Sequence, residues 1–327
     1  MTIGTLSPTE KDLYKIVALV RQLAERENSG APATISATGT ANLDGSYAGK
    51  TVFLDASAGS ITLTIAAAAS LPVDWLVRLV RVDGSANAIT VSATIDGRAT
   101  ARLISQYDSA TIRKRASSFV TSEARWKRRI LYYNYTGSSQ TFTVANEVPL
   151  GCNNYLLEGV GAGGSGAGGD TTTPQRLGGG GGGAMGRKLV ATTLDTSLTF
   201  SPGQGGAPVA AVASPGTPGN AGGNTTITGP NLGTLTAGGG AGAPTSTAGG
   251  AAGSATGAWD ESIPGEAGFP TTGLAVLVGM GGNSPRAPGG KGNVGATGST
   301  PGGGGAGSNH VASNSGAGGN GWVAVYI

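Results

Sequence analysis

Few residues of this chain belong to the types that catalyse reactions or bind metals. The 327 residues include one histidine, His310, and one cysteine, Cys152. His310 lies in a tract of Gly, Ser and Asn, which offers nothing to orient the imidazole as a Ser-His-Asp triad requires. A lone cysteine forms no internal disulfide, and no Cys/His cluster is present that could hold zinc, haem or an iron–sulfur centre. We therefore expect no bound metal and no cofactor.

Two other arrangements resemble sites of enzymes. Asp260, Glu261 and Glu266 follow Trp259, but glycoside hydrolysis needs two carboxyl groups about 5–9.5 Å apart across one sugar, and adjacent loop residues suit this poorly. The string GAGGSG at 161–166 matches the GxGxxG pattern of dinucleotide binding, yet no helix follows it. We therefore predict that the chain is not an enzyme.

Glycine dominates the second half of the chain. Of the 61 glycines, residues 1–150 hold 9 and residues 151–327 hold 52, far above the average usage of about 7 %. Uninterrupted runs at 178–183 and 302–305 exclude a collagen triple helix, which needs glycine at every third position. Composition of this kind is typical of a disordered tail, so an ordered alternative needs a reason for glycine to pack.

The N-terminal segment predicts a helix over residues 7–27. Ser7 is a suitable N-cap, Pro8 occupies the first helical position and Glu10 completes a capping box. Its apolar residues recur at heptad spacing and form a seam of Leu6, Leu13, Ile16, Val20 and Leu23. This seam indicates either an amphipathic helix docked on its own domain or a short parallel coiled coil that sets the oligomeric state.

Residues 31–135 change to a period of two. Apolar residues alternate with small polar ones in SITLTI (60–65) and AITVSATI (88–95), which is typical of half-buried strands. No crossover helices separate the strands, so we predict an antiparallel β-sandwich or meander rather than a parallel sheet.

An Arg-x-Asp-Gly-Ser-x-Asn string at 81–87 precedes Gln-Tyr-Asp-Ser at 106–109, and Trp126 follows. This pattern resembles a β-module of bacteriophage tail fibres and tail-tip proteins. Asp74 departs from the glycine that is usual in that module. The matching positions are Leu71, Pro72, Arg81, Asp83, Gly84, Ser85, Asn87, Thr90, Val91, Gln106, Tyr107, Asp108 and Ser109.

Residues 136–327 carry a second resemblance. Two strands, glycine blocks, a hairpin and a closing apolar strand (GWVAVYI) are similar to the glycine-rich domain at the C-terminus of phage tail fibres and adhesins. The resemblance implies polyglycine II helices packed side by side. Such helices have three residues per turn and no internal hydrogen bonds, so their backbone groups must pair with neighbouring chains. Only glycine lets backbones approach closely enough for this lattice.

Charge gathers in the first half of the chain. Residues 1–150 carry 16 basic and 12 acidic residues. The basic cluster comprises Arg113, Lys114, Arg115, Arg125, Lys127, Arg128 and Arg129, with Trp126, Tyr132, Tyr133 and Tyr135 nearby. It could bind nucleic acid or anionic glycans. We prefer the interpretation that the cluster belongs to a solvated β-hairpin, which pairs with acidic groups of a neighbouring subunit. Nucleic-acid binding is therefore not expected.

The best candidates for recognition are the few large side chains among the glycines. Residues 258–289 concentrate them, and aromatic residues dominate binding at interfaces. We predict receptor-binding roles for Trp259, Asp260, Phe269, Leu274, Met280 and Arg286. The alternative is that part of this apolar set packs a trimer axis or caps the glycine lattice.

The two resemblances imply a homotrimeric phage tail fibre. The expected fold is mainly β with irregular glycine-rich structure. Residues 1–30 form a trimerisation helix that attaches to other tail or baseplate proteins. Residues 31–135 form an antiparallel β-module that serves as a shaft, and residues 136–327 form a polyglycine II domain. Its loops would bind a host cell-surface protein or glycan. The expected location is the virion tail, extracellular after host lysis, with no membrane insertion and no secretory signal. The alternatives are a structural fibre, decoration or connector protein of the virion, or an ice-binding or cell-surface glycine-rich protein.

Overall fold

A computed structural model describes residues 32–36, 38–169, 177–212, 216–270, 279–291, 295–308 and 313–327. The expected helix over 7–27, with its seam residues, lies outside these ranges. The described chain is mainly β and divides into two compact units. Unit 1 ends at Lys127 and includes Ala145–Asn153, and unit 2 comprises Arg128–Val144 and Asn154–Ile327.

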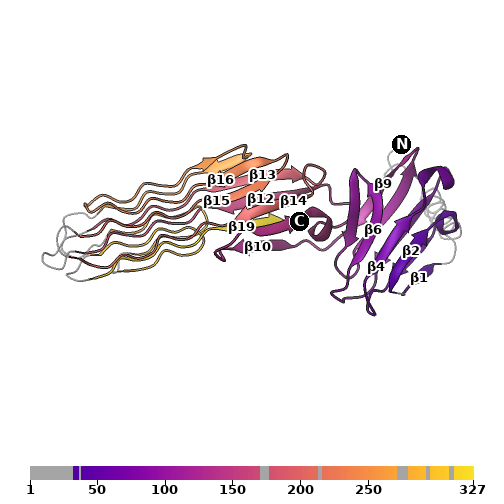
Figure 1. The fold of residues 1–327 in the computed structure, drawn as a ribbon, viewed down its shortest axis with the longest axis horizontal. Helices are drawn as coiled ribbons and strands as arrows, with labels where there is room; N and C mark the ends of the chain where they lie inside the picture. Colours follow the sequence, from indigo (N-terminus) through magenta and orange to yellow (C-terminus); the bar gives the residue numbers. More distant parts are fainter. Residues whose placement is uncertain are drawn as a thin grey trace, which may run out of the picture. The chain divides into compact units, whose positions relative to one another are not determined.

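Unit 1 is a β-solenoid-like arrangement of nine strands (Figure 1). β1 (Ala33–Ile35), β3 (Thr51–Leu54) and β5 (Leu76–Arg81) pair in parallel as one stack. β2 (Gly39–Leu43), β4 (Ile61–Ile65) and β6 (Ile89–Ile95) pair in parallel as a second stack. Short 3-10 turns, η2 (Gly45–Tyr47) and η3 (Ala68–Ser70), lie in the connections. The remaining strands, β7 (Arg98–Leu103), β8 (Ser109–Arg115) and β9 (Ser118–Arg125), pair in antiparallel fashion on β6, β5 and β8.

The predicted antiparallel pairing is therefore wrong for the first six strands. The chain alternates between the two stacks, so two parallel neighbours are connected through a strand of the other stack. A parallel crossover is usually made by a helix, but a strand of the second stack spans the same gap here. The period-two pattern itself is confirmed, because Ile61, Leu63, Ile89 and Val91 are all buried.

The motif residues of the β-module meet in one buried polar network. The guanidinium of Arg81 is almost fully buried and donates to the carbonyl oxygens of Leu103, Ile104 and Asn87 at 3.0–3.1 Å. It also pairs with the Asp83 carboxylate at 3.0 Å. The network thus joins the ends of β5 and β7 to the turn before β6, which gives these polar residues a structural role.

Unit 2 begins with two five-stranded antiparallel sheets (Figure 1). The first sheet has the order β10 (Ile130–Asn134), β19 (Trp322–Tyr326), β12 (Asn154–Val160), β13 (Met185–Ala191) and β18 (Glu261–Ile263). The second has the order β11 (Gln140–Thr143), β14 (Ser197–Ser201), β15 (Thr225–Gly229), β16 (Gly233–Ala237) and β17 (Ala255–Thr256). A short helix, α2 (Val144–Glu147), follows β11. Rings of Tyr133 and Tyr155 from the first sheet pack against Phe142 and Phe200 from the second.

Unit 2 includes residues that precede the predicted glycine-rich domain of 136–327. β10 lies before that position, yet it pairs along its whole length with the C-terminal strand β19, from Ile130 opposite Tyr326 to Asn134 opposite Trp322. The closing strand therefore draws residues 130–134 into the glycine-rich unit.

The glycine segments run side by side away from the sheets (Figure 1), and their hydrogen bonds repeat every three residues. Within segment 177–184, the amides of Gly178, Gly181 and Ala184 donate to carbonyls of segment 238–246. The amides of 179 and 182 donate to segment 264–270, and those of 180 and 183 donate to segment 302–308. A period of three matches the polyproline II-type helix, which bonds only to its neighbours.

Three inner segments, 161–169, 177–184 and 302–308, are surrounded on all sides and are buried at every residue. Segment 177–184 donates to three neighbours and accepts from three others, which are 161–169, 247–254 and 279–283. The other two inner segments also bond to six neighbours each. We call the whole array the glycine bundle. Its outer segments in the described chain are 202–212, 216–224, 238–246, 247–254, 264–270, 279–283, 287–291, 295–300 and 313–321.

The six consecutive glycines at 178–183 follow directly from this packing. A Cβ built at any of these positions would lie within 2.2 Å of a carbonyl oxygen of a neighbouring segment. The neighbour changes with the same period of three: segment 247–254 for 178 and 181, segment 279–283 for 179 and 182, and segment 161–169 for 180 and 183. No face of the inner segment has room for a side chain. In the described ranges these runs are therefore packed structure, as expected from the close approach that glycine permits.

Candidate functional site

Phe269 and Met280, two of the predicted binding residues, lie side by side on the glycine bundle. The Phe269 amide donates to the Met280 carbonyl at 2.8 Å. These residues are 44 % and 40 % exposed, so part of each remains accessible to a partner. They flank residues 271–278, which lie outside the described ranges together with the predicted Leu274.

The position of this pair along the bundle is fixed by backbone bonds. Gly179 donates to the Phe269 carbonyl, and Gly178 donates to the Ser246 carbonyl. Both glycines lie at the end of segment 177–184 that is farther from strand β13. We call this end the bundle tip, formed in the described chain by Gly169, Leu177, Val212, Ser246, Phe269, Met280, Ser308 and Ser313.

The tip carries exposed apolar side chains on a base that cannot rearrange easily. Val212 is 42 % exposed, and its amide donates to the Gly169 carbonyl at 3.1 Å. Gly169 donates in turn to Ser313 at 3.2 Å, and Leu177 donates to Ser308 at 3.1 Å. The backbone beneath the exposed groups is thus cross-linked by hydrogen bonds between segments that are distant in sequence. A base of this kind holds contact residues in place before a partner arrives.

Trp259 lies at the other end of the bundle, next to the sheets, and is half-buried. Its ring packs against Gly159 of β12 and Gly186 of β13, where a Cβ on Gly186 would come within 2.3 Å of the indole. The indole N–H donates to the Thr236 carbonyl of β16 at 3.2 Å. The ring therefore connects the two sheets, which gives Trp259 a packing role within unit 2.

Asp260 and Arg286 also bind their own chain. Asp260 accepts from the Lys188 ammonium at 2.6 Å and from the Leu189 amide at 2.8 Å. The hydrogen bond from Lys188, followed by the one from Leu189, lowers the pKa of Asp260 below its usual value. Arg286 donates through Nε to Glu158 at 2.7 Å, and this bond raises the pKa of Arg286.

Glu158 was not expected from the sequence. Its side chain is fully buried, and Arg187 pairs with it at 2.7 Å beside Arg286. Arg187 also reaches Glu261 at 3.0 Å. The available signal was a glutamate inside the otherwise apolar strand NYLLEGV, because a buried charge needs a partner. The three charged residues fasten the 284–287 turn onto the first sheet of unit 2.

The predicted site is thus divided. Phe269 and Met280 meet at the tip, whereas Trp259, Asp260 and Arg286 are engaged beside the sheets. A receptor-binding role stays a prediction for all five residues, and the contacts that the structure shows for the last three lie within unit 2.

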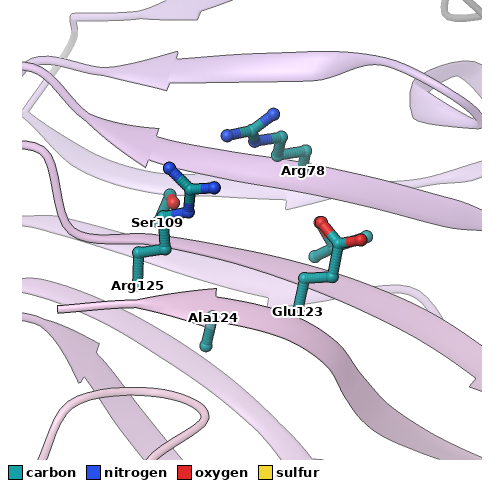
Figure 2. Close-up of a pocket in the computed structure, with 6 residues that line it drawn as sticks. Arg78, Ser109, Glu123, Ala124 and Arg125 are labelled. Atoms are coloured by element: carbon teal, nitrogen blue, oxygen red, sulfur yellow. The ribbon is translucent and has the colours of Figure 1, made fainter.

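The predicted basic cluster is also divided, because Arg128 and Arg129 belong to unit 2 and the others to unit 1. In unit 1, Arg125 borders a hollow of about 290 Å³ (Figure 2). Arg78 of β5 and Glu123 of β9 face the same hollow, with the Ser109 hydroxyl beneath Arg125 (Figure 2). A register shift between Thr111 and Ile112 distorts the β8–β9 pairing there, as bulges beside binding sites often do.

The aromatic residues near this cluster in sequence do not line the hollow. Tyr132 packs on Trp322, and Tyr133 packs on Phe200, both in unit 2. The Tyr135 hydroxyl donates to Gln204 at 3.0 Å. Stacking of nucleobases, which needs exposed rings along a basic groove, therefore has no support at this hollow.

None of the helices in the described ranges has the length and apolar character of a membrane span. No three side chains of His, Cys, Asp or Glu in that part of the chain are grouped as a metal site would require.

A family model covers most of unit 2. This model, of a glycine-rich domain, matches residues 136–327, which is more than half of the chain. The chain therefore belongs to the glycine-rich domain family. No curated protein matches it.

Proposed function

We propose that the chain is a bacteriophage tail fibre or tail-tip protein whose bundle tip binds the surface of the host bacterium. The supporting observation concerns the predicted binding residues at the two ends of the bundle. Trp259, Asp260 and Arg286 beside the sheets form hydrogen bonds with their own chain. Phe269 and Met280, together with Val212, are exposed at the tip on a base of backbone hydrogen bonds.

In this proposal the glycine segments are polyglycine II helices that serve as a scaffold. The chain forms a homotrimer through its N-terminal segment, which also attaches to the virion tail. Three tips bind together, so that weak individual contacts combine into strong attachment. The partner is a surface protein or glycan of the host.

A structural fibre, decoration or connector protein of the same virion is the second candidate. The engagement of Trp259, Asp260 and Arg286 within unit 2 favours it, because residues predicted to bind a receptor instead stabilise the scaffold. This candidate and the adhesin differ in whether the free chain occupies receptors on the cell.

A competition assay tests the proposal. Host cells are incubated with the purified full chain, and the adsorption of phage is then measured. The adhesin slows adsorption in proportion to its concentration. The double variant Phe269→Ser/Met280→Ser loses this effect, whereas Leu189→Ser, an apolar residue 58 % exposed on β13, retains it. A folded wild-type chain that leaves adsorption unchanged contradicts the proposal and favours the structural candidate.

A further inference from the structure

Tyr107 of unit 1 has an unfavourable backbone conformation and an exposed ring. It is the third residue of a tight turn closed by a 3.0 Å bond from the Asp108 amide to the Ser105 carbonyl. Its φ is +68°, a left-handed conformation that bulky residues rarely adopt and that glycine adopts freely. The side chain is 70 % exposed, so core packing does not compensate for the strain. Strain of this kind is concentrated at functional sites.

The turn is held by buried groups. The Asp108 carboxylate is nearly inaccessible and accepts from the amides of Ile104 and Ser105 at 2.9 and 2.8 Å. Its other oxygen accepts from the Lys127 amide at 3.2 Å. The Tyr107 amide donates to the Arg81 carbonyl at 2.8 Å. One carboxylate thus places the backbones of both Tyr107 and Lys127.

These two residues border a hollow of about 540 Å³. Its lining consists of Gly84, Ser85, Ile104, Ser105, Gln106, Tyr107 and Lys127. Gln106 is anchored by a 2.9 Å bond from Nε2 to the Val82 carbonyl. The lining contains no acidic residue, and within the described chain the Lys127 ammonium and the Tyr107 ring have no hydrogen-bond, ionic or ring partner. The hollow thus offers a flat ring, a free cation and several polar groups.

We infer that this hollow binds an acidic saccharide. A sugar ring would lie on the face of Tyr107, and its carboxylate, phosphate or sulfate group would pair with the Lys127 ammonium. The Ser105 and Gln106 side chains supply hydrogen bonds for ring hydroxyls. The arrangement fits the usual composition of ligand sites, where an apolar surface is combined with a few fixed polar groups.

A nucleic-acid strand fits this hollow less well. Strands are bound by a continuous basic groove with several aromatic rings for successive bases, and this lining has one ring and one cation. The site is separate from the bundle tip, and direct binding to saccharides is measured without cells. Failure here therefore leaves the proposed function of the tip unaffected.

The test uses the full chain and an array of oligosaccharides that bear uronate, phosphate or sulfate groups, each with its neutral counterpart. The wild type is expected to bind an acidic member and to bind its neutral counterpart more weakly. Tyr107→Phe keeps the ring and the affinity, whereas Tyr107→Asn weakens binding about tenfold or more, the loss typical of an anchoring aromatic residue. Lys127→Gln weakens it about tenfold, as loss of a charged hydrogen bond does.

Two matched controls separate binding from folding and from general charge. Asn adopts positive φ more readily than Tyr, so Tyr107→Asn leaves the melting temperature unchanged or raises it. Ala116→Asn relieves a φ of +46° away from the hollow and leaves binding intact. Arg115→Gln removes an exposed charge at the end of β8, in the β8–β9 hairpin, and also leaves binding intact.

Four results would overturn the inference: no acidic member of the array binds; Tyr107→Asn lowers the melting temperature by several degrees; Arg115→Gln weakens binding as much as Lys127→Gln; or poly(dT) binds with the same dependence on Tyr107.

Discussion

Replacement of Gly181 by alanine tests whether the glycine bundle is packed as tightly as its hydrogen bonds indicate. Gly181 is the fourth glycine of the inner run, and a Cβ there would lie 1.9 Å from the Ala251 carbonyl oxygen. Cβ contacts below 3.0 Å are essentially never seen, so segment 247–254 must move by at least 1.1 Å. Its bonds to the inner segment are short, 2.8 Å from Gly250 to Gly179 and 2.9 Å from Gly253 to Gly182.

The expected loss of stability is large for the addition of one methyl group. Overpacking of an interior costs about 1–3 kcal/mol, and each buried backbone bond that is broken adds about 1 kcal/mol. Displacing segment 247–254 weakens its two bonds to the inner segment and the 2.9 Å bond from Ala241 to Ala251. The lower conformational entropy of the unfolded alanine variant stabilises the folded state by about 0.4–1 kcal/mol and offsets part of this loss. We therefore expect Gly181→Ala to lower the free energy of opening the bundle by about 4 kcal/mol.

Native-state hydrogen exchange of peptides from the bundle measures this free energy directly. The control is Gly45→Ala in unit 1, where a Cβ would meet only Pro72 Cδ at an ordinary 3.5 Å. That variant should leave exchange in the bundle unchanged. If the opening free energy of Gly181→Ala lies within about 1 kcal/mol of the wild-type value, the close-packed lattice does not exist in solution.

Three further predictions concern charged and aromatic residues. Glu158→Gln removes the charge that holds two arginines and should lower the free energy of unfolding of unit 2 by about 2 kcal/mol, after discounting for their partial exposure. The urea midpoint of unit 2 should fall accordingly, and an unchanged midpoint contradicts this. Burial opposes ionisation of Asp83, but hydrogen bonds from Ser85, the Ala56 amide and Arg81 outweigh it and lower the pKa of Asp83 below its unfolded value. This stabilisation is present above about pH 4 and is lost as the pH falls, so thermal melts should show acid sensitivity that Asp83→Asn reduces. Trp259→Ala should destabilise unit 2 by about 2 kcal/mol, since the ring is half-buried. The urea midpoint of unit 2 measures this. An unchanged midpoint would contradict a packing role for Trp259 and favour a role in recognition.

The sequence predicts which side chains of unit 1 are buried but not which strands are neighbours. Alternation in SITLTI and AITVSATI identifies one buried face, and Ile61, Leu63, Ile89 and Val91 are buried. Alternation is the same in parallel and antiparallel strands, because both have a side-chain period of two. The alternation of successive strands between the two stacks depends on contacts between strands that are distant in sequence, such as β2 and β4, and no local pattern encodes these contacts.

The candidate site could be predicted only in part, because hydrophobicity does not distinguish an anchor for a partner from one for the scaffold. Trp259 and Phe269 both stand out among glycines, but only Trp259 has glycines of β12 and β13 beneath its ring. Those glycines are about 100 and 73 residues earlier in the sequence. Glu158 has a local signal, its charge within an apolar strand, whereas its arginine partners come from β13 and from the 284–287 turn.

Recognition of the host by the bundle tip is tested most directly by the adsorption rate of phage particles that carry Phe269→Ser/Met280→Ser. We predict that these particles assemble with intact tails and adsorb much more slowly than the wild type, while particles with Leu189→Ser adsorb normally. Normal adsorption by the double variant would contradict the assignment of recognition to the tip.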